Sequence, residues 1–371
     1  MRSFFDEILK YNWEEECGSI YAKRAVHVEE ALGKEKRTLE DFKALVSPAA
    51  SGFLEPMAKL SKKLTQKRFG KTIQLYLPLY LSNECTNFCV YCGFNHNNKI
   101  NRLTLNEEMV LKEVEAIKDM GYEHLLLVTG EHSRKCGVDF LARMIELVKP
   151  WFSQISVEVA PMDQDEYERL LKSGLNTVYI YQETYHSANY GLYHPKGKKA
   201  NFRYRLETPD RLGKAGVHRV GLGCLLGLED WRTDSYFTAL HLNYLERNYW
   251  KTKYSISFPR LRPHAGSFQP NFIVTDRDLA QLIFAYRIFD EEVEISLSTR
   301  EKPSFRDNML KLGVTSMSAG SKTEPGGYAL NTRALEQFTV SDNRTAAEIE
   351  AKIKQFGYEA VWKDWDACLQ E

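Results

Sequence analysis

The sequence lacks several features that mark common functional classes. It has no apolar run near the roughly 18 residues that cross a bilayer. Its acidic beginning, residues 1–7, differs from the basic-then-apolar pattern of a secretion signal. Lysine plus arginine and aspartate plus glutamate both number 50, so no net charge attracts nucleic acid or an anionic membrane. We therefore expect a cytoplasmic protein with no nucleic-acid or membrane partner.

Cysteine is also scarce, with seven in 371 residues. An odd number, with three crowded into residues 85–92, is unlike the spread of pairs in a disulfide-stabilised secreted chain. This pattern favours a reducing compartment. We interpret the four remaining cysteines as small buried apolar side chains; they are Cys17, Cys136, Cys224 and Cys368.

The chain divides into three parts by pattern. Residues 1–71 are helical in pattern and polar, which predicts an N-terminal helical extension that packs on the rest or contacts a partner. From residue 72, short apolar runs rich in β-formers alternate with amphipathic helix patterns, as in βα units on a parallel sheet. We expect this main domain to cover 72–335. A charged, aromatic-containing tail, 336–371, is expected to pack on it.

Eight segments of the main domain have strand patterns. They are 72–81, 124–129, 155–159, 177–182, 219–225, 254–259, 294–298 and 315–318. Eight strands in about 250 residues match the size of a (βα)8 barrel, and an open doubly wound sheet is the alternative. Thr104 with Glu107 three residues later predicts a capping box at the start of the first barrel helix.

Cys85, Cys89 and Cys92 carry the strongest chemical signal. Thiolates select iron–sulfur clusters, zinc or copper(I). A structural zinc ion normally takes four protein ligands, and no fourth cysteine is near, so three thiolates favour a four-iron cluster with one open iron. Zinc remains an alternative if His96 supplies a fourth ligand. In that case the chain would be a metal-stabilised binding protein and no enzyme.

A CxxxCxxC motif with an aromatic residue, Tyr91, before the last cysteine and directly after the first strand resembles the radical SAM superfamily. The resemblance implies one [4Fe–4S] cluster whose open iron binds S-adenosyl-L-methionine (SAM). It also implies that one electron from the cluster cleaves SAM to methionine and a 5′-deoxyadenosyl radical, which ends as 5′-deoxyadenosine. The cofactor then carries the difficult chemistry, while the protein orients it and excludes water.

In a barrel, functional residues follow the strands at their C-terminal ends. Gly130 and Glu131, after the second strand, resemble the family's element that contacts the SAM ammonium. Gln182 and Glu183, after the fourth strand, suit ribose hydroxyls or the same ammonium. Arg205 stands where relatives place an arginine on the SAM carboxylate, which a guanidinium binds by two hydrogen bonds. An ordinary turn and a solvated helix arginine are the alternatives.

Two later strand ends suggest a substrate site. Arg260 and Arg262 alternate and so face one side, which indicates either an anionic ligand or salt bridges. Ser-Thr-Arg-Glu at 298–301 and Ser-Ala-Gly-Ser at 318–321 resemble the aromatic amino acid lyase branch of the superfamily. That resemblance implies that Arg300 binds the substrate carboxylate with help from Ser318. We place the following residues at the substrate: Arg262, Arg300, Ser318 and Ser321.

Within this branch the chain resembles the tyrosine lyases of bacterial thiamine biosynthesis. The resemblance implies cleavage of the Cα–Cβ bond of L-tyrosine to 2-iminoacetate (dehydroglycine) and p-cresol, after hydrogen abstraction from the amino group. It implies thiazole synthase as the protein that receives 2-iminoacetate, and a flavodoxin or ferredoxin as electron donor. The tyrosine lyase of hydrogenase maturation is one alternative, although its pattern adds cysteines where this tail has only Cys368. A tryptophan lyase of the same branch is another.

Overall fold

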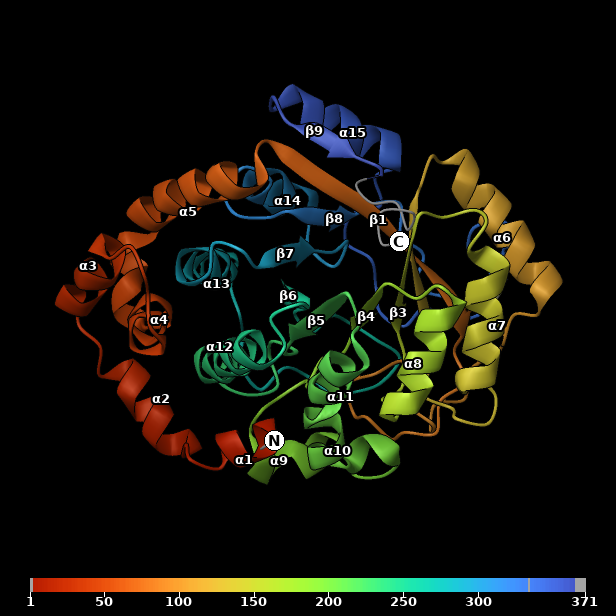
Figure 1. Ribbon diagram of the computed structural model, residues 1–371, viewed down its shortest axis with the longest axis horizontal. Coiled ribbons are helices and arrows are strands. Elements are labelled where there is room, and N and C mark those ends of the chain that lie inside the picture. The colour runs from red at the N-terminus through yellow and green to blue at the C-terminus, as the bar shows by residue number, and fades with distance from the viewer. Residues whose placement is uncertain (1–2, 333, 364–371) are drawn as a thin grey trace.

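The structure, a computed structural model, describes residues 3–332 and 334–363. Eight parallel strands form a closed ring in the order β2-β3-β4-β5-β6-β7-β8-β1, and β1 pairs back to β2. The strands are β1 (Thr72–Ser82), β2 (His124–Thr129), β3 (Gln154–Glu158), β4 (Thr177–Tyr179), β5 (Arg219–Gly223), β6 (Lys253–Ser257), β7 (Glu294–Leu297) and β8 (Ser316–Ser318). The closed ring confirms the (βα)8 barrel and excludes the open sheet (Figure 1).

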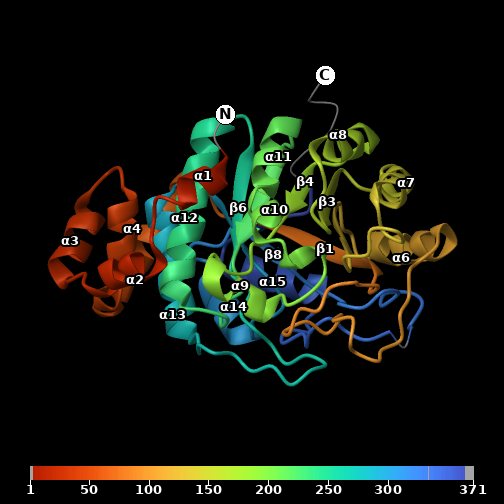
Figure 2. The same ribbon diagram turned by 90° about the horizontal axis from the view of Figure 1, so that it is seen from below.

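Helices surround the ring, as expected from the alternating pattern (Figure 2). They are α6 (Glu107–Asp119), α7 (Val138–Val148), α8 (Gln164–Ser173), α9 (Ser187–Tyr193), η2 (Lys198–Ala200), α10 (Phe202–Leu206), α11 (Thr208–Ala215), α12 (Trp231–Asn248), α13 (Asp276–Phe289) and α14 (Pro303–Met309). No helix in the described ranges is long and apolar enough to cross a membrane.

The predicted capping box of α6 was wrong. The helix begins two residues later than expected, and Asn106 is its N-cap, because its side chain accepts from the Met109 backbone N–H. Thr104 pairs instead with Ser82, Oγ1 to Oγ at 2.7 Å. The Thr104 hydroxyl is therefore bonded to Ser82 at the end of β1 and does not cap the helix.

The inner face of β1 explains why the barrel has room for a ligand. Side chains of the strand alternate, and Leu75, Leu77 and Leu79 are buried in the hydrophobic core. The intervening Tyr76 and Tyr80 line a pocket inside the ring. The phenol side chains line a polar cavity inside the barrel. In most such barrels, branched aliphatic side chains fill this interior.

A ninth strand, β9 (Glu359–Val361), was missed by the sequence analysis. It pairs in parallel with the first residues of β1, before the segment that pairs with β2. The helix α15 (Ala346–Gln355) precedes it and packs on it. Three residues form too short a pattern to predict a strand. The tail residues 364–371, including Cys368, lie outside the described part of the chain.

The N-terminal residues form an arc of helices on one side of the barrel, against α12 and α13 (Figure 1). They are α1 (Phe4–Ile8), α2 (Trp13–Tyr21), α3 (Ala25–Gly33), α4 (Leu39–Val46), η1 (Pro48–Phe53) and α5 (Leu54–Phe69). Buried contacts join the arc to the barrel helices: Phe4 stacks on His241 with ring centroids 3.7 Å apart. Gln281 donates from Nε2 to the backbone carbonyls of Leu45 and Ser47.

Candidate active site

The three cysteines lie on the long loop between β1 and α6 and line one pocket at the C-terminal end of the barrel. The guanidinium of Arg102 holds this loop. It donates to four backbone carbonyls of the loop at 2.6 to 3.3 Å. They belong to Asn83, Phe94, Asn95 and Asn98. The side chain of Arg102 therefore fixes the conformation of a loop that contains no helix or strand.

The turn after β2 packs against the cysteine loop at Gly130. A Cβ atom at this position would overlap the carbonyl oxygen of Glu84. The next residue is joined to the loop directly, because the Thr86 backbone N–H donates to the Glu131 carbonyl at 3.0 Å. The Gly-Glu pair predicted from sequence thus adjoins the cysteines because only glycine permits this approach.

The donor set fits an iron–sulfur cluster better than a zinc ion. Burial raises the pKa of Cys85 to about 11 and also raises the pKa values of Cys89 and Cys92. The three thiols therefore keep their protons when no metal is bound, and a bound metal would displace those protons. In the described ranges no three His, Cys, Asp or Glu side chains converge as a single ion requires. His96 is exposed, and its Nδ1 donates to the Cys85 carbonyl at 3.1 Å. These side chains fit three corners of a four-iron cluster.

Tyr91 is buried beside the cysteines and keeps its phenol proton. Its hydroxyl lies 2.7 Å from Nε2 of His194, whose Nδ1 lies 3.0 Å from the Tyr190 carbonyl. Since a carbonyl only accepts, Nδ1 carries the hydrogen and Nε2 accepts from the phenol. Burial lowers the pKa of His194 to about 2, which keeps the imidazole neutral. Tyr91 is therefore a rigid wall of the pocket.

A neutralised cluster of charges lies beside the cysteine loop. Arg205 reaches Glu131 with Nη1 at 2.9 Å and Glu183 with Nη2 at 3.6 Å. Lys199 lies 2.6 Å from Glu183, and Asn87, inside the CxxxCxxC motif, donates to Glu131 at 2.7 Å. Three of the predicted SAM-contacting residues are thus brought together. Lys199 was missed by the sequence analysis, since nothing in its lysine-rich surroundings distinguishes it.

Two neighbours in sequence, Gln182 and Glu183, have different surroundings. Glu183 lines the pocket and has a φ of 72°, a left-handed conformation that costs free energy in a residue with a side chain. Gln182 is buried but does not line the pocket, and its Nε2 has no hydrogen-bond partner in the described residues. The kink at Glu183 directs its carboxylate toward the ion-paired cluster.

Arg300 lies at the other wall of the pocket, where no described residue supplies a counter-ion. Its guanidinium carbon lies 3.4 Å from the centre of the Phe338 ring, and its guanidinium makes no hydrogen bond or ion pair within residues 3–332 and 334–363. Burial lowers its pKa, which remains that of a cation at neutral pH. Ser318 and Ser321 also line the pocket, and Oγ of Ser321 has no described partner.

Arg262 lines the same pocket but is already paired. Arg260 and Arg262 both bind the buried carboxylate of Glu301, with Nη2 of Arg262 at 3.0 Å. The two arginines do face one side, as their spacing predicted. Of the two alternatives raised by the sequence, the structure contains the salt bridges.

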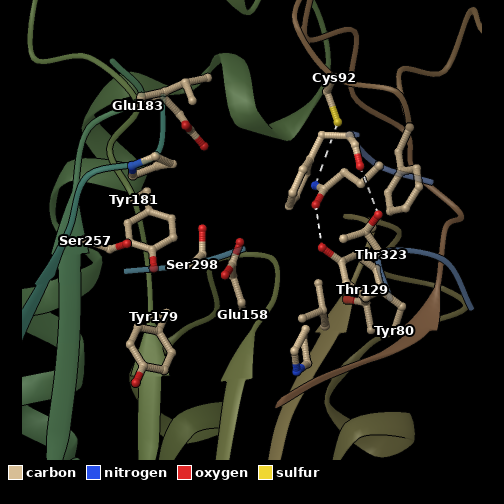
Figure 3. Close-up of a pocket in the computed structure, with 18 of the residues that line it drawn as sticks. Tyr80, Cys92, Thr129, Glu158, Tyr179, Tyr181, Glu183, Ser257, Ser298 and Thr323 are labelled. Atoms are coloured by element: carbon tan, nitrogen blue, oxygen red, sulfur yellow. Dashed lines mark hydrogen bonds between the residues drawn. The ribbon is translucent and has the colours of Figure 1, made fainter. Parts of the chain in front are cut away.

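Glu158 is the pocket residue that strand-end reasoning should have found. It ends β3, and Figure 3 shows its carboxyl pointing into the pocket, with Tyr181 and Cys92 at either side. Burial raises its pKa to about 7, with Glu183 adding to the shift and Arg300 opposing it. Tyr80 was also missed: it donates to Oε1 of Gln337 at 2.7 Å, and Nε2 of Gln337 lies 4.0 Å from the Cys92 sulfur.

Comparisons with known proteins show the family of the chain. The model of the radical SAM superfamily matches residues 79–234, and that of the Biotin and Thiamin Synthesis associated domain matches 257–359. The chain is 49% identical to 2-iminoacetate synthase of Escherichia coli and 46% identical to that of Salmonella typhimurium. Both alignments span 370 residues, which are all of this chain and 98% of each relative.

The solved structures of HydG, a maturase of [FeFe]-hydrogenase, are similar in fold. One superposes with a TM-score of 0.86 at 31% identity and covers 98% of this chain and 79% of that chain. HydG from Carboxydothermus hydrogenoformans superposes with a TM-score of 0.85 at 29% identity, over 99% and 83% of the two chains. From the cysteine loop, the pocket and the match over its whole length, the chain belongs to the radical SAM enzymes and, among them, to the 2-iminoacetate synthase family.

Proposed function

We propose that this enzyme cleaves the Cα–Cβ bond of L-tyrosine to 2-iminoacetate and p-cresol and so supplies the C–N unit of the thiamine thiazole. The observation that carries the proposal is the guanidinium of Arg300, which no residue of the described ranges pairs with, in the pocket that also contains the three cysteines. An unpaired cation in a partly buried site requires an anion, and an amino acid carboxylate is one that a guanidinium binds through two hydrogen bonds.

The cofactor side of the pocket follows from the residues that surround it. Cys85, Cys89 and Cys92 would hold the [4Fe–4S] cluster, and SAM would occupy its open iron. When bound, the two together would supply hydrogen-abstracting radical chemistry. The residues we assign to SAM are Tyr91, Gly130, Glu131, Glu183 and Arg205. Gln182, which the sequence placed with them, is buried outside the pocket. Glu131 and Glu183 present acceptors for the SAM ammonium, and Arg205, held between them, presents donors for the SAM carboxylate.

On the substrate side, Arg300 would hold the carboxylate of tyrosine, and the Ser318 hydroxyl, which accepts from the Thr299 backbone N–H at 3.2 Å, would donate to it. We assign Ser321 to the same subsite, because its hydroxyl has no hydrogen-bond partner among the described residues. Arg262, which the sequence also placed there, is paired with Glu301 instead. Fixing the carboxylate at one wall limits the positions of the amino group, so geometry decides which hydrogen is removed. A displacement of about 1 Å would cost roughly 100-fold in rate.

The test is anaerobic incubation of the reconstituted protein with reductant, SAM and tyrosine, followed by chromatography. We expect 5′-deoxyadenosine, methionine, p-cresol and 2-iminoacetate, the last detected as its hydrolysis product. A colour change on reduction reports the cluster, whereas a zinc protein stays colourless. Turnover of SAM without p-cresol would refute the assignment of tyrosine as substrate. Cleavage of tryptophan in place of tyrosine would show that the enzyme is a tryptophan lyase.

Two protein partners and a location belong to the same proposal. A flavodoxin or ferredoxin would deliver the electron, because cleavage of SAM consumes one. Thiazole synthase would receive 2-iminoacetate directly, because an imine hydrolyses in water. We also place the enzyme in the cytoplasm, where thiols remain reduced. Co-purification with thiazole synthase, and turnover with each reduced donor, test the two contacts.

A further inference from the structure

Glu158 and Arg300 approach the pocket from opposite sides of the barrel. Glu158 ends β3 and Arg300 follows β7, and three strands separate β3 from β7 in either direction around the ring. Both side chains line the pocket. They are electrostatically coupled but form no ion pair with each other. A ligand between them therefore meets a cation on one side and a carboxyl on the other.

Glu158 differs from the other two glutamates of the pocket wall. Glu131 and Glu183 are neutralised by Arg205 and Lys199. Glu158 makes no hydrogen bond or ion pair within the described part of the chain, and Figure 3 shows its carboxyl directed into the space between the pocket walls. A half-buried carboxyl that no described residue binds is available to a ligand, because burial without a partner costs free energy.

The groups that face Glu158, together with its burial, explain why its pKa is raised. The charged ones come from four other segments of the barrel mouth: Arg300 follows β7, Lys199 is in η2, Arg205 is in α10 and Glu183 follows β4. Phenols complete the surroundings: Tyr76, Tyr80, Tyr179 and Tyr181. Burial and Glu183 together outweigh the three cations, so the pKa rises to about 7 and the carboxyl is close to half ionised at neutral pH.

The proposed reaction needs a proton acceptor at this position. Free tyrosine carries an ammonium group at neutral pH, since an α-amino group has a pKa of roughly 8 or above. Removing a hydrogen atom from an ammonium would leave the positive charge on an electron-deficient nitrogen, which is much harder than removing it from a neutral amine. An acceptor whose pKa lies near the working pH suits the transfer best.

We propose that Glu158 is the general base that takes one proton from the ammonium group of bound tyrosine before a hydrogen atom is removed, while Arg300 holds the carboxylate. This inference rests on the proposed function. The ammonium N–H bond breaks and a carboxyl O–H bond forms, and the electron pair stays on nitrogen. The net charge of the pocket does not change, and no oxidant or reductant is consumed. The proton returns to solvent when the products leave.

The experiment compares pH profiles of Glu158→Gln, Glu158→Asp and wild type in single turnovers of the reconstituted enzyme, with 5′-deoxyadenosine and p-cresol quantified. Wild type should gain rate as pH rises to about 7 and then level off. Glu158→Gln should lose about 10²- to 10⁴-fold at pH 7. It should recover toward pH 9 to 10, where solution deprotonates the amine. Glu158→Asp should keep the wild-type profile at a reduced rate. Glu115→Gln, an exposed glutamate on α6, is the matched control.

A second readout separates proton transfer from binding. Equilibrium dialysis of labelled tyrosine against each holoenzyme at pH 7 should give dissociation constants within about threefold of wild type. A Glu158→Gln rate or profile equal to that of wild type overturns the proposal, and so does a loss of tyrosine binding as large as the loss of rate. Rescue at pH 7 by 3,5-difluorotyrosine, whose phenol is acidified, would overturn it in favour of phenol deprotonation. Failure of wild type to form p-cresol would instead refute the proposed function.

Discussion

The buried ion pair between Arg306 and Asp342 allows a sharp test of how the tail positions the active site. Both side chains are 0% exposed, and the second guanidinium nitrogen of Arg306 donates to the Ser318 carbonyl. The backbone N–H of Asp342 donates to the Thr299 carbonyl at 3.1 Å. One pair therefore joins the tail to the ends of β7 and β8, next to Arg300.

Asp342→Asn removes the charge and keeps the shape. Breaking one side of a buried pair costs about 3–5 kcal/mol, because the remaining charge is left without compensation. We expect about 3 kcal/mol, the lower end, because the asparagine oxygen still accepts from Arg306 and because Arg344 keeps Asp307 as a partner at 2.9 Å. We also expect a higher KM for tyrosine, since Ser318 and Arg300 lose their support. Binding of SAM should change little.

Urea denaturation of the metal-free protein measures the free energy of unfolding. Asp307→Asn is the control, because the Asp307–Arg344 pair is 22% and 21% exposed and should contribute under about 1 kcal/mol. The partners Arg344 and Arg306 lower the pKa of Asp342 despite its burial. Wild type should therefore lose its advantage over Asp342→Asn as pH falls below about 4, where the carboxylate takes up a proton. A variant as stable as wild type at pH 7, or an Arg306→Met/Asp342→Leu double variant no more stable than the single one, would refute this reasoning.

Three further predictions concern the pocket. Arg300→Lys keeps the charge but loses the planar fork, so KM for tyrosine should rise at least about tenfold with SAM affinity nearly unchanged; an equal loss of both contradicts the carboxylate role. Cys92→Ala should abolish the visible absorbance of the reconstituted cluster, whereas Cys17→Ala should keep it. Glu158→Gln should stabilise the metal-free protein by about 2–3 kcal/mol at pH 8, because a carboxyl with a raised pKa must ionise at a cost in the folded state. That gain should vanish below about pH 4.5, where both folded and unfolded carboxyls hold a proton, and denaturation at the two pH values tests it.

Local pattern determines the features that depend on near neighbours in the chain. The spacing of Cys85, Cys89 and Cys92 brings three thiols onto one loop whatever the rest of the protein does. The alternation of β1 places its leucines outward and its tyrosines inward, since side chains of a strand alternate between its faces. Parallel strands also end at one rim, so residues that follow them, such as Glu131 and Arg300, were expected together before their partners were known.

Partnership between charges was decided only by the tertiary structure. Arg262 and Arg300 both follow barrel strands, yet Glu301 neutralises one, and the other has no counter-ion in the described residues. The pKa of Glu158 likewise depends on burial and on side chains from other strands. Electrostatic free energy falls with distance in space and ignores separation in sequence. The pairing of these charges therefore depends on the closed barrel, which brings side chains from different strands together.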